Sequence, residues 1–289
     1  DSVICDNGNC DDTNCDKVHS HDNSVGDMFC DSCTRNIPVL DTLSIVDKDI
    51  LQAACKIKTN FTMGTDQIPA FFVRDCISCL YTPLCHLFNL IIRTSTFPEV
   101  WKIAKVCPIH KSDSRSDIKN YRPVAIIPNV AKSFQIIRSN TVYAHVKPYI
   151  SDRLHGFLKG KSTCTNLAEF TQFVSNALNC RQQVDVMYSD LSKAFDNVDH
   201  SSLLNKLSLF GLCDSLVLLF KSILVGQRQF VEYQEYKSNE YDCTSGVCQG
   251  SDLGPLLFII FINDIVLRLG QDCDVYMYAD DIKIVKIVN

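Results

Sequence analysis

The chain has 289 residues, of which 46% are hydrophobic and 21% are charged. This length and composition exclude a disordered protein and a small disulfide scaffold, and they allow one large domain or two subdomains with a substantial core. The longest uninterrupted apolar run, LLFIIFI at 256–262, is far shorter than the ~18 residues of a membrane-spanning helix, so we expect no membrane partner.

The charge is unevenly distributed along the chain. The net charge of −5 argues, taken alone, against a nucleic-acid partner. Residues 1–50 hold 11 Asp and no Glu against Lys17, Arg35 and Lys48, so this segment carries −8 and residues 51–289 carry +3. The body of the chain is therefore mildly basic, and the acidity belongs to the N-terminal segment.

Residues 1–40 are rich in Asp and Cys, and we expect them to form a disordered leader. The segment has no hydrophobic signal region and does not begin with Met, which predicts an intracellular protein, of the cytoplasm or the nucleus, and a piece of a longer chain. CDSC at 30–33 has the two-residue gap of half a zinc site, but the other Cys and His residues match no zinc spacing. A zinc-binding module at 5–33 is the alternative.

The cysteines of the body stand singly in apolar surroundings. In a long chain without an export signal they are not read as disulfides, so they are predicted to be small buried thiols. They include Cys55, Cys85, Cys107, Cys164, Cys180 and Cys213.

Helical periodicity begins after residue 40. A loop at 62–69 separates the first predicted helix from a long one that runs from Ala70 to Ile92. Another helix begins near 196 and ends at Gly211, since Gly is favoured just past a helix end. Further helices are predicted over 129–147, 164–179 and 253–269.

A strand pair is predicted at 103–109 and 121–127, joined by the turn KSDSRSD. Between 101 and 122 there are six basic and two acidic residues. These charges either keep an edge strand soluble or clamp phosphates. A second hairpin is expected to turn at Ser238–Asn239, and a strand is expected over 183–190.

The chain closes with DVYMYADDIKIV at 274–285, two β-prone runs around Asp280 and Asp281. An isolated Asp pair most often marks a hairpin tip. A metal site would need a third carboxylate, for which Asp190, at the end of the strand 183–190, is the candidate. Converging carboxylates repel one another unless divalent cations neutralise them, and two Mg²⁺ ions about 3.5–4 Å apart would suit phosphoryl transfer.

Seven segments that follow one another along the chain point to one family. They are GTDQIPAFF at 64–72, FPEVWKIAKVCPIHK at 97–111, NYRPVAIIPNVAKSF at 120–134, HGFLKGKSTCTNLAEF at 155–170, YSDLSKAFDNVDH at 188–200, SGVCQGSDLGPLLFIIFINDI at 245–265 and YADD at 278–281. Each is weak alone, but their order makes them specific. From about residue 45 to its end, the chain resembles the reverse transcriptase domain of non-LTR retrotransposons of the LINE type, in particular the jockey-like ones.

The resemblance implies an α+β fold: the fingers and palm of a right-hand polymerase, with an antiparallel palm sheet, truncated before the thumb. Fingers and N-terminal helices would occupy 41–180 and the palm 181–289. The implied activity is RNA-directed DNA polymerisation, in which a primer 3′-hydroxyl attacks the α-phosphate of a deoxynucleotide. The implied partners are an RNA template, a DNA primer and dNTPs, with two Mg²⁺ ions, or Mn²⁺ as a substitute.

The resemblance also assigns residues. Asp190, Asp280 and Asp281 match the catalytic, metal-binding carboxylates. The nucleotide-binding positions are Lys111 and Arg122 for the triphosphate, Phe195 under the sugar, and Gln249 with Gly250 along the nucleotide and template. Phe195 could equally be core packing. His155, Lys159 and Lys161 suit either contact with the template backbone or a solvated loop.

Two departures from the family pattern support a second hypothesis. Cys248 stands where the family has Pro, and Asp252 stands where it has an apolar residue. The chain would then be a degenerate, truncated remnant without polymerase activity that at most binds RNA. An RNA-dependent RNA polymerase is disfavoured, because YADD replaces its usual GDD and because Phe195 would exclude a 2′-hydroxyl.

Overall fold

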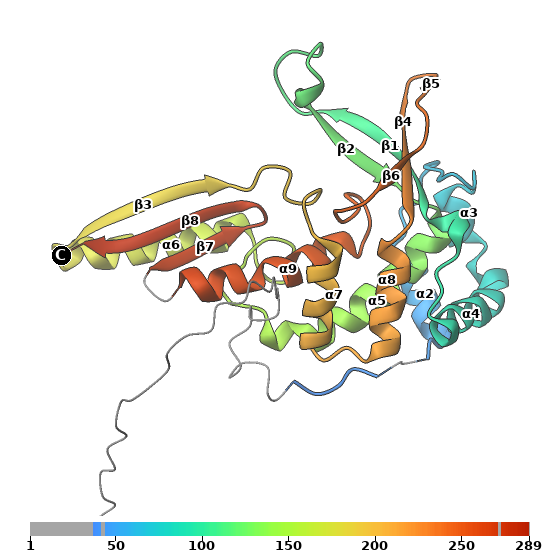
Figure 1. The fold of residues 1–289 in the computed structure, drawn as a ribbon, viewed down its shortest axis with the longest axis horizontal. Helices are drawn as coiled ribbons and strands as arrows, with labels where there is room; N and C mark the ends of the chain where they lie inside the picture. The colour runs from blue at the N-terminus through green and yellow to red at the C-terminus, as the bar shows by residue number, and fades with distance from the viewer. Residues whose placement is uncertain (1–36, 42–43, 271–272, 289) are drawn as a thin grey trace, which may run out of the picture.

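The computed structural model describes residues 37–41, 44–270 and 273–288 of the chain, which form a mixed helical and β structure with mostly antiparallel strands (Figure 1). The helices are α2 (Asp47–Lys56), α3 (Ala70–Asp75), α4 (Ile77–Thr94), α5 (Asn129–Val146), α6 (Thr163–Asn179), α7 (His200–Leu209), α8 (Asp214–Leu224) and α9 (Gly254–Leu269). The strands are β1 (Ile103–His110), β2 (Tyr121–Ile126), β3 (Gln183–Asp190), β4 (Gln227–Tyr233), β5 (Tyr236–Lys237), β6 (Tyr241–Cys243), β7 (Asp274–Tyr278) and β8 (Asp281–Val288).

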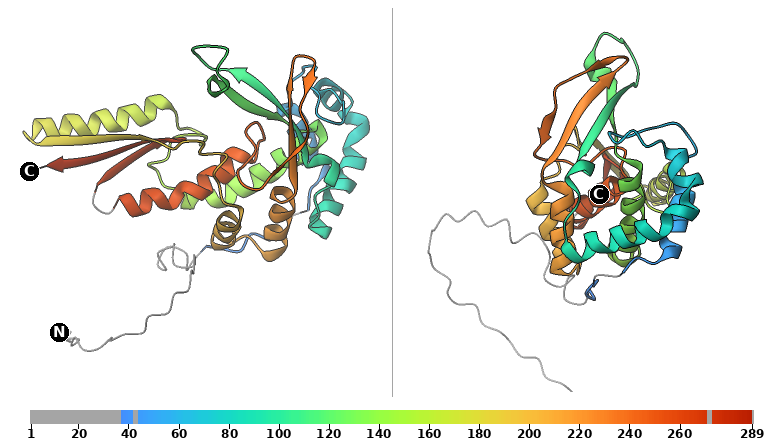
Figure 2. Two further views of the ribbon diagram at one scale, coloured as in Figure 1. Left: turned by 45° about the horizontal axis from the view of Figure 1, so that its top comes forward. Right: turned by 90° about the vertical axis from the view of Figure 1, so that its right-hand side faces the viewer.

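A three-stranded antiparallel sheet has the order β3-β8-β7 and lies between α6 and α9 (Figure 2). The rings of Phe170 and Phe173 on α6 meet the ring of Tyr276 edge-on, at centroid distances of 6.0 and 6.3 Å. Because side chains alternate along a strand, Val275 and Met277 point to the opposite face and join the core there. Strand β7 is thus packed on both faces, whereas the end of β3 is exposed at Met187 and Tyr188.

A five-stranded sheet has the order β2-β1-β4-β5, with β6 also paired to β4. It contains the predicted β1–β2 hairpin, whose pairing runs from Lys105↔Ile126 to His110↔Tyr121. β4 joins β1 in parallel, and every other pairing in the sheet is antiparallel. The β1–β2 and β4–β5 hairpins project from the helical body (Figure 1).

The helical body shares one hydrophobic core with the three-stranded sheet. Phe88 on α4 and Phe134 on α5 meet with ring centroids 5.3 Å apart, and Phe220 and Phe258 bring α8 and α9 into the same core. This core continues to Val275 and Ile282 in the sheet. It therefore forms a rigid support beneath the β7–β8 hairpin.

Two predicted elements need correction. The helix expected over 70–92 is divided into α3 and α4 at Cys76, whose φ of −93° and ψ of 11° leave the helical range, and apolar spacing does not reveal such a break. The hairpin that begins with β4 turns at 234–235, with Gln234 at a φ of 55°, and does not turn at Ser238–Asn239. Ser238 lies past the turn, where its Oγ accepts a hydrogen bond from Val231 N and its N donates to Val231 O.

The six single cysteines are not buried thiols as predicted. Cys55, Cys164 and Cys180 are exposed, whereas Cys85, Cys107 and Cys213 are partly exposed. Apolar neighbours in sequence do not imply burial here, because successive residues of a helix point to different sides.

The expected leader falls largely on residues 1–36, which lie outside the described residues, as does the zinc alternative at 5–33. Within the predicted leader, residues 37–40 are described, and Leu40 N donates a hydrogen bond to Gly211 O over 2.7 Å. Across 37–41, 44–270 and 273–288, no helix is both long and apolar enough to cross a membrane.

Packing and pairing cross residue 180, the predicted division between fingers and palm. β4 and β6, from the C-terminal part, join the sheet of β1 and β2, and α6, from the N-terminal part, packs against β3 and β7. The core is continuous across residue 180, so the structure does not separate two domains there. The division into fingers and palm stays a prediction.

A buried ion pair joins α7 to α9. Lys206 Nζ lies 2.6 Å from Asp264 Oδ1, both side chains are buried, and the ammonium also donates to the carbonyl of Phe261.

We predict that Asp264→Ala lowers the free energy of unfolding by about 3–5 kcal/mol, because it leaves the buried charge of Lys206 unpaired. The double variant Lys206→Met, Asp264→Leu should recover most of the loss in urea unfolding. A single variant as stable as the parent would contradict this role.

Candidate active site

The pairing of β3 with β8 brings the predicted carboxylates together. Asp190 lies opposite Asp281, and Leu191 N donates a hydrogen bond to Asp280 O over 3.2 Å. That bond makes Asp190 and Asp281 a non-hydrogen-bonded pair, for which Cα atoms lie about 4.5 Å apart and side chains share one face. Asp280 occupies the adjoining turn between β7 and β8.

The turn is short and conformationally demanding. Tyr278 pairs with Asp281, so only Ala279 and Asp280 connect the strands, and Ala279 has a φ of 55°. Asp190 and Asp281 are exposed, and Asp280 is partly exposed. Within the described residues none of the three carboxylates has a hydrogen-bonding or ion-pairing partner. Three carboxylates that form no ion pair with a described residue thus lie at one end of the sheet.

A cavity of about 540 Å³ lies beside these carboxylates. Asp190, Tyr278 and Asp281 line it from the sheet, together with Tyr188 and Lys283. The first turns of α6 form the other wall through Thr163, Asn166 and Leu167. The cavity is open to solvent and mixes carboxylate, ammonium and hydroxyl groups.

The residue types at this end of the sheet fit magnesium, which takes oxygen ligands and is commonly held by one or two carboxylates plus water and substrate phosphates. The charges of Asp190 and Asp281, which form no ion pair with a described residue, favour a cation there. In the described part of the chain, no three His, Cys, Asp or Glu residues are arranged as a complete metal site. The arrangement fits an ion that substrate oxygens help to hold.

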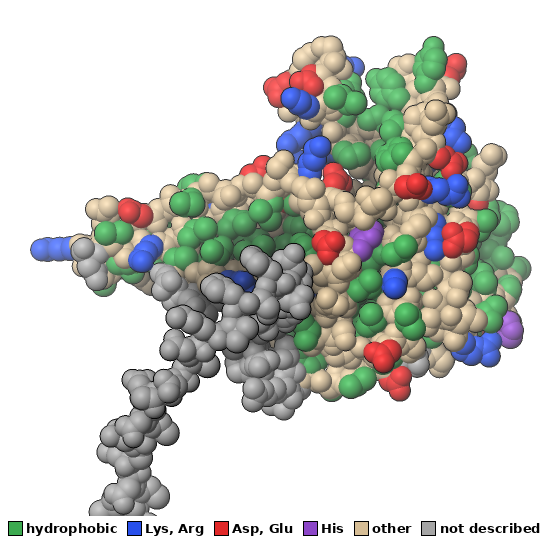
Figure 3. Space-filling view, in the orientation of Figure 1, with side chains coloured by type: hydrophobic (Ala, Val, Ile, Leu, Met, Phe, Trp, Pro, Cys, Tyr) green, Lys and Arg blue, Asp and Glu red, His purple; other side chains and the backbone are tan. Residues whose placement is uncertain are grey.

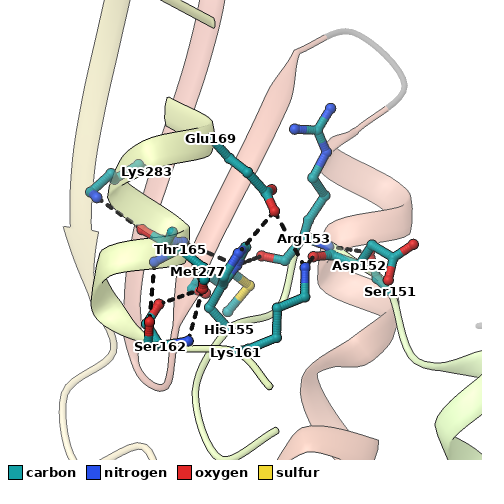
Figure 4. Close-up of polar contacts among 11 residues, drawn as sticks. Ser151, Asp152, Arg153, His155, Lys161, Ser162, Thr165, Glu169, Met277 and Lys283 are labelled. Carbon is teal, nitrogen blue, oxygen red and sulfur yellow. Dashed lines mark hydrogen bonds and ion pairs between the residues drawn. The ribbon is translucent and has the colours of Figure 1, made fainter. Parts of the chain in front are cut away.

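A loop from a distant part of the sequence braces the strand that leads to the turn (Figure 4). His155 N donates to Met277 O over 2.9 Å, and Met277 N donates to Arg153 O over 3.1 Å. A Cβ on Gly156 would lie 2.3 Å from Ala279 N, so the loop and the turn are in direct backbone contact. The conformation of the turn therefore depends on residues 153–156.

His155 is a buried member of this brace, not a template contact or part of a solvated loop. Its side chain is 1% exposed, and its Nε2 lies 3.2 Å from Glu169 Oε1 on α6. Lys161 Nζ approaches the same oxygen at 3.3 Å and donates to Asp152 O. Lys159, by contrast, is exposed over the ring of Tyr143.

Asn166 extends the network to β8. Its Nδ2 donates to Met277 O over 3.3 Å, and its Oδ1 accepts a hydrogen bond from Lys283 Nζ over 3.0 Å. Asn166 is buried, so one α6 side chain links both strands of the hairpin that carries Asp280. Sequence reasoning missed the roles of Asn166 and Glu169, which a hydrophobic helix pattern does not distinguish.

Phe195 is partly buried and packs on the core. Its ring stacks on Phe258 of α9, with centroids 4.5 Å apart and an angle of 17°, and Phe157 meets it edge-on. Val247 N donates to Phe195 O over 2.8 Å. Phe195 therefore does pack on the core, and its contact with a nucleotide sugar stays a prediction.

Gln249 and Gly250 connect the loop before α9 to β2. Gln249 O accepts a hydrogen bond from Ala125 N over 2.7 Å, and Gln249 Nε2 reaches Asp196 Oδ1 at 3.4 Å. Gly250 has a φ of +118°, and a Cβ there would lie 2.4 Å from Ala125 O. Only Gly fits this position. The loop thus ties the five-stranded sheet to the segment that carries Asp196.

Lys111 and Arg122 are exposed on the β1–β2 hairpin. Arg122 pairs across the ladder with Ile109, and Lys111 N donates to Asn120 O just past the strand end. Neither side chain forms an ion pair with a described residue or lines the cavity beside Asp190. They remain available for an anion, but the structure does not bring them into contact with the carboxylates.

The two departures from the family pattern lie in the same loop. Burial raises the pKa of the Cys248 thiol to about 12, so this cysteine is protonated at neutral pH. Asp252 lies 3.9 Å from Lys132, and its buried Oδ2 has no hydrogen-bond partner. Burial raises the pKa of Asp252 more than Lys132 lowers it.

We predict that Gly156→Ala disrupts the brace. Its Cβ would collide with the backbone of Ala279, so we expect the free energy of unfolding to fall by about 1–3 kcal/mol and the amide of Met277 to exchange faster. Gly160→Ala is the matched control: Gly160 has a φ of +83° but open space around it, so it should cost about 1 kcal/mol of strain and leave Met277 protected. Unchanged exchange in Gly156→Ala would contradict the brace.

We predict that Asp252→Val stabilises the chain by up to about 1 kcal/mol at pH 7. The substitution removes a carboxylate oxygen that has no hydrogen-bond partner and only a distant ion pair with Lys132, and the gain is limited because part of the group still meets water. Folding raises the pKa of Asp252, so ionising this carboxyl lowers stability as pH rises from its unfolded pKa through the raised one. The advantage of the variant should therefore vanish below about pH 3.9 in urea unfolding. Asp252→Asn should give part of the gain.

Comparison with known proteins identifies the family. Residues 109–286 match the family described as "Reverse transcriptase (RNA-dependent DNA polymerase)". The chain is 30% identical over 208 residues to the RNA-directed DNA polymerase from mobile element jockey of Drosophila melanogaster, which covers 68% of this chain and 22% of that protein. It is 28% identical over 187 residues to the probable RNA-directed DNA polymerase from transposon X-element of the same fly, covering 62% and 20%.

Among solved structures, the partial Cas6-RT-Cas1–Cas2 complex matches with a TM-score of 0.45 and 21% identity, covering 83% of this chain and 36% of that one. The chain spans about a fifth of the length of the curated relatives named above. The family match covers more than half of the chain, and the named relatives confirm the resemblance drawn from the seven segments. The chain belongs to the reverse transcriptase family, as a domain of the non-LTR, LINE type.

Proposed function

We propose that the chain is the fingers and palm of an RNA-directed DNA polymerase, with its catalytic centre at the end of the β3-β8-β7 sheet. The observation that carries the proposal is the register of β3 and β8, which sets Asp190 opposite Asp281 and beside Asp280. The β3-β8-β7 sheet and α9 belong to the predicted palm at 181–289, and the β1–β2 hairpin belongs to the predicted fingers at 41–180. Two segments cross this division in sequence: α6 packs on the palm sheet, and β4 to β6 join the sheet of the fingers. No thumb is assigned to the described residues.

In this proposal Asp190 and Asp280, with Asp281 beside them, hold two magnesium ions, for which manganese can substitute. When bound, the ions neutralise the carboxylates and stabilise the charge that develops on the phosphoryl oxygens. The β3–β8 ladder and the brace at 153–156 already hold the backbone at these positions, so binding an ion requires only rotation of the carboxylate side chains. Such preorganised charge is the main source of catalysis in phosphoryl transfer.

The remaining predicted residues hold the nucleotide. Lys111 and Arg122 supply positive charge for a triphosphate, with Arg offering a planar fork and Lys a point charge. Phe195, fixed on Phe258, lies under the sugar and favours a deoxynucleotide. Gln249 and Gly250 follow the nucleotide and template. The partners are an RNA template, a DNA primer and dNTPs.

The second candidate is a remnant that binds RNA without polymerising. Asp252 favours it, since its Oδ2 has no hydrogen-bond partner and only a 3.9 Å ion pair with Lys132, which weakens the loop that leads into α9. This candidate predicts that the chain binds RNA with salt-dependent affinity and that it extends no primer with Mg²⁺ or Mn²⁺.

Primer extension on an RNA template tests both candidates. For a parent chain that extends a DNA primer with Mg²⁺, Asp190→Asn and Asp280→Asn should each lower the rate at least about 100-fold, because each removes a preorganised charge of the centre. Asp185→Asn, on an exposed position of the same strand, should extend at the parent rate. An Asp280→Asn variant as fast as the parent would refute the site. A parent that binds RNA but extends nothing would establish the remnant.

A further inference from the structure

One lysine shares the cavity beside the candidate carboxylates. Lys283 on β8 lines this cavity together with Asp190 and Asp281. Among the described residues that line it, Lys283 is the only Lys or Arg. The cavity therefore contains two carboxylates and one ammonium group, and the ammonium has no role in the proposed function.

The strand register places Lys283 on the same face of the sheet as the carboxylates. Asp281 pairs with Asp190, and Lys283 follows Asp281 by two residues, so all three side chains leave the sheet on one side. Two residues of an antiparallel strand span about 6.8 Å. A diagonal neighbour on the adjacent strand lies about 7–8 Å away. Lys283 is therefore close to both carboxylate residues without lying in contact range along the backbone.

The other face of the sheet is apolar near the turn. Ile284 pairs there with Met187 on β3 and with Val275 on β7. Figure 3 is seen from this side, which is opposite to α6, and shows hydrophobic side chains gathered over the strands. Lys283 is thus not one charge of a generally charged surface. The charged groups at this end of the sheet are concentrated on the α6 face.

The ammonium of Lys283 is held in place by Asn166 on α6. Lys283 Nζ donates to Asn166 Oδ1 over 3.0 Å, the bond that Figure 4 shows reaching from Lys283 to the helix. The Nδ2 of the same amide donates to Met277 O over 3.3 Å. Asn166 is buried, and turning its amide over would set two oxygens against each other. The position of the ammonium is therefore fixed by the brace.

The charge of Lys283 is not cancelled by its own partners. Asn166 is neutral, and Lys283 forms no ion pair with a carboxylate of the described chain. The ammonium also lies 5.2 Å from the centroid of the Phe170 ring, a cation–π contact that leaves its charge in place. Lys161, by contrast, is paired with Glu169. The field of Lys283 therefore acts on the carboxylates of the cavity, which also lack an ion pair.

We propose that Lys283 is a built-in counter-charge of the carboxylate centre and sets the affinity of this centre for divalent cations. The ammonium offsets part of the repulsion between Asp190 and Asp281, and it opposes a cation that enters the same cavity. For a divalent ion about 7–8 Å away in a solvated site at low salt, Coulomb's law gives a loss of roughly three- to tenfold in affinity.

The counter-charge favours cations that arrive with substrate phosphates, because these add the negative charge that Lys283 takes away. Lys283 acts through the carboxylates and is not a catalytic residue. The inference deepens the proposed function and rests on it, since it concerns the cations of the same centre.

The test is Mn²⁺ binding to the 289-residue chain at low salt, without nucleic acid or dNTP, measured by the electron paramagnetic resonance of free Mn²⁺. Lys283→Met keeps an apolar stem on Phe170 and removes the charge, so it should tighten Mn²⁺ binding roughly three- to tenfold. Lys283→Gln, which can still donate to Asn166, should do the same. Lys283→Arg keeps the charge and should bind Mn²⁺ as the parent does.

Lys286→Met is the matched control. Lys286 is exposed on the same strand but does not line the cavity, and it lies about 17 Å along β8 from Asp281. At that distance a charge is largely screened, so the variant should change the Mn²⁺ affinity less than about twofold.

Two further arms separate charge from packing. The Asp190→Asn, Asp281→Asn double variant removes the site, so Lys283→Met should leave the residual Mn²⁺ binding of this background unchanged. Raising KCl from about 25 mM to about 500 mM screens charge, so the difference between Lys283→Met and the parent should shrink below about twofold. Parent or weaker Mn²⁺ affinity in both Lys283→Met and Lys283→Gln, or equal tightening in the double-variant background, would overturn the proposal.

Primer extension separates this inference from the proposed function. A chain whose Mn²⁺ affinity responds to Lys283→Met but that extends no primer supports the counter-charge and refutes the polymerase. A chain that extends primers while Lys283→Met binds Mn²⁺ as the parent does refutes the counter-charge alone. In an active chain, Lys283→Met should also reach half-maximal extension at a lower Mg²⁺ concentration than the parent.

Discussion

The antiparallel register of β3 and β8 is the constraint on which the candidate site depends. It forces Asp190 and Asp281 to share one face, with Asp280 in the adjoining turn, although like charges repel. The repulsion is tolerated because the ladder continues to Gln183↔Val288 and the opposite face of the sheet is anchored in the core. Folding energy from distant apolar contacts thus holds the carboxylates where a cation would be favoured.

The loop 153–156 supports the hairpin whose second strand, β8, pairs with β3. A loop more than a hundred residues earlier in the chain pairs with Met277, and buried His155 and Asn166 anchor it to α6. Lys283, two residues past Asp281, bonds to Asn166 and so adds a positive charge to the same wall. The hairpin is therefore held on its α6 face by polar bonds and by the rings packed on Tyr276, and on its α9 face by apolar packing, which limits movement of the turn.

The sequence predicted the approach of the three carboxylates better than it predicted the contacts that support them. The alternation of apolar residues before Asp190 and around Asp280 predicts strands that end in carboxylates. The family resemblance of the seven segments then predicts that these strand ends lie together. The sequence around His155 suggests a solvated loop, because its polar partner Glu169 lies on a helix whose periodicity marks apolar contacts only. The parallel pairing of β1 with β4 joins segments over a hundred residues apart, which no local pattern encodes.

The loop 248–252 connects the two sheets. Gln249 bonds to Ala125 of β2 and reaches Asp196, so the placement of the five-stranded sheet beside the segment that follows Asp190 depends on this loop. Asp252 and Cys248 lie in the loop but supply no group to the cavity beside Asp190. Asp252 Oδ2 has no hydrogen-bond partner, so the cost of this residue falls on the stability of the loop. Drift at position 252 would therefore impair the relation between the two sheets before it altered the carboxylates themselves.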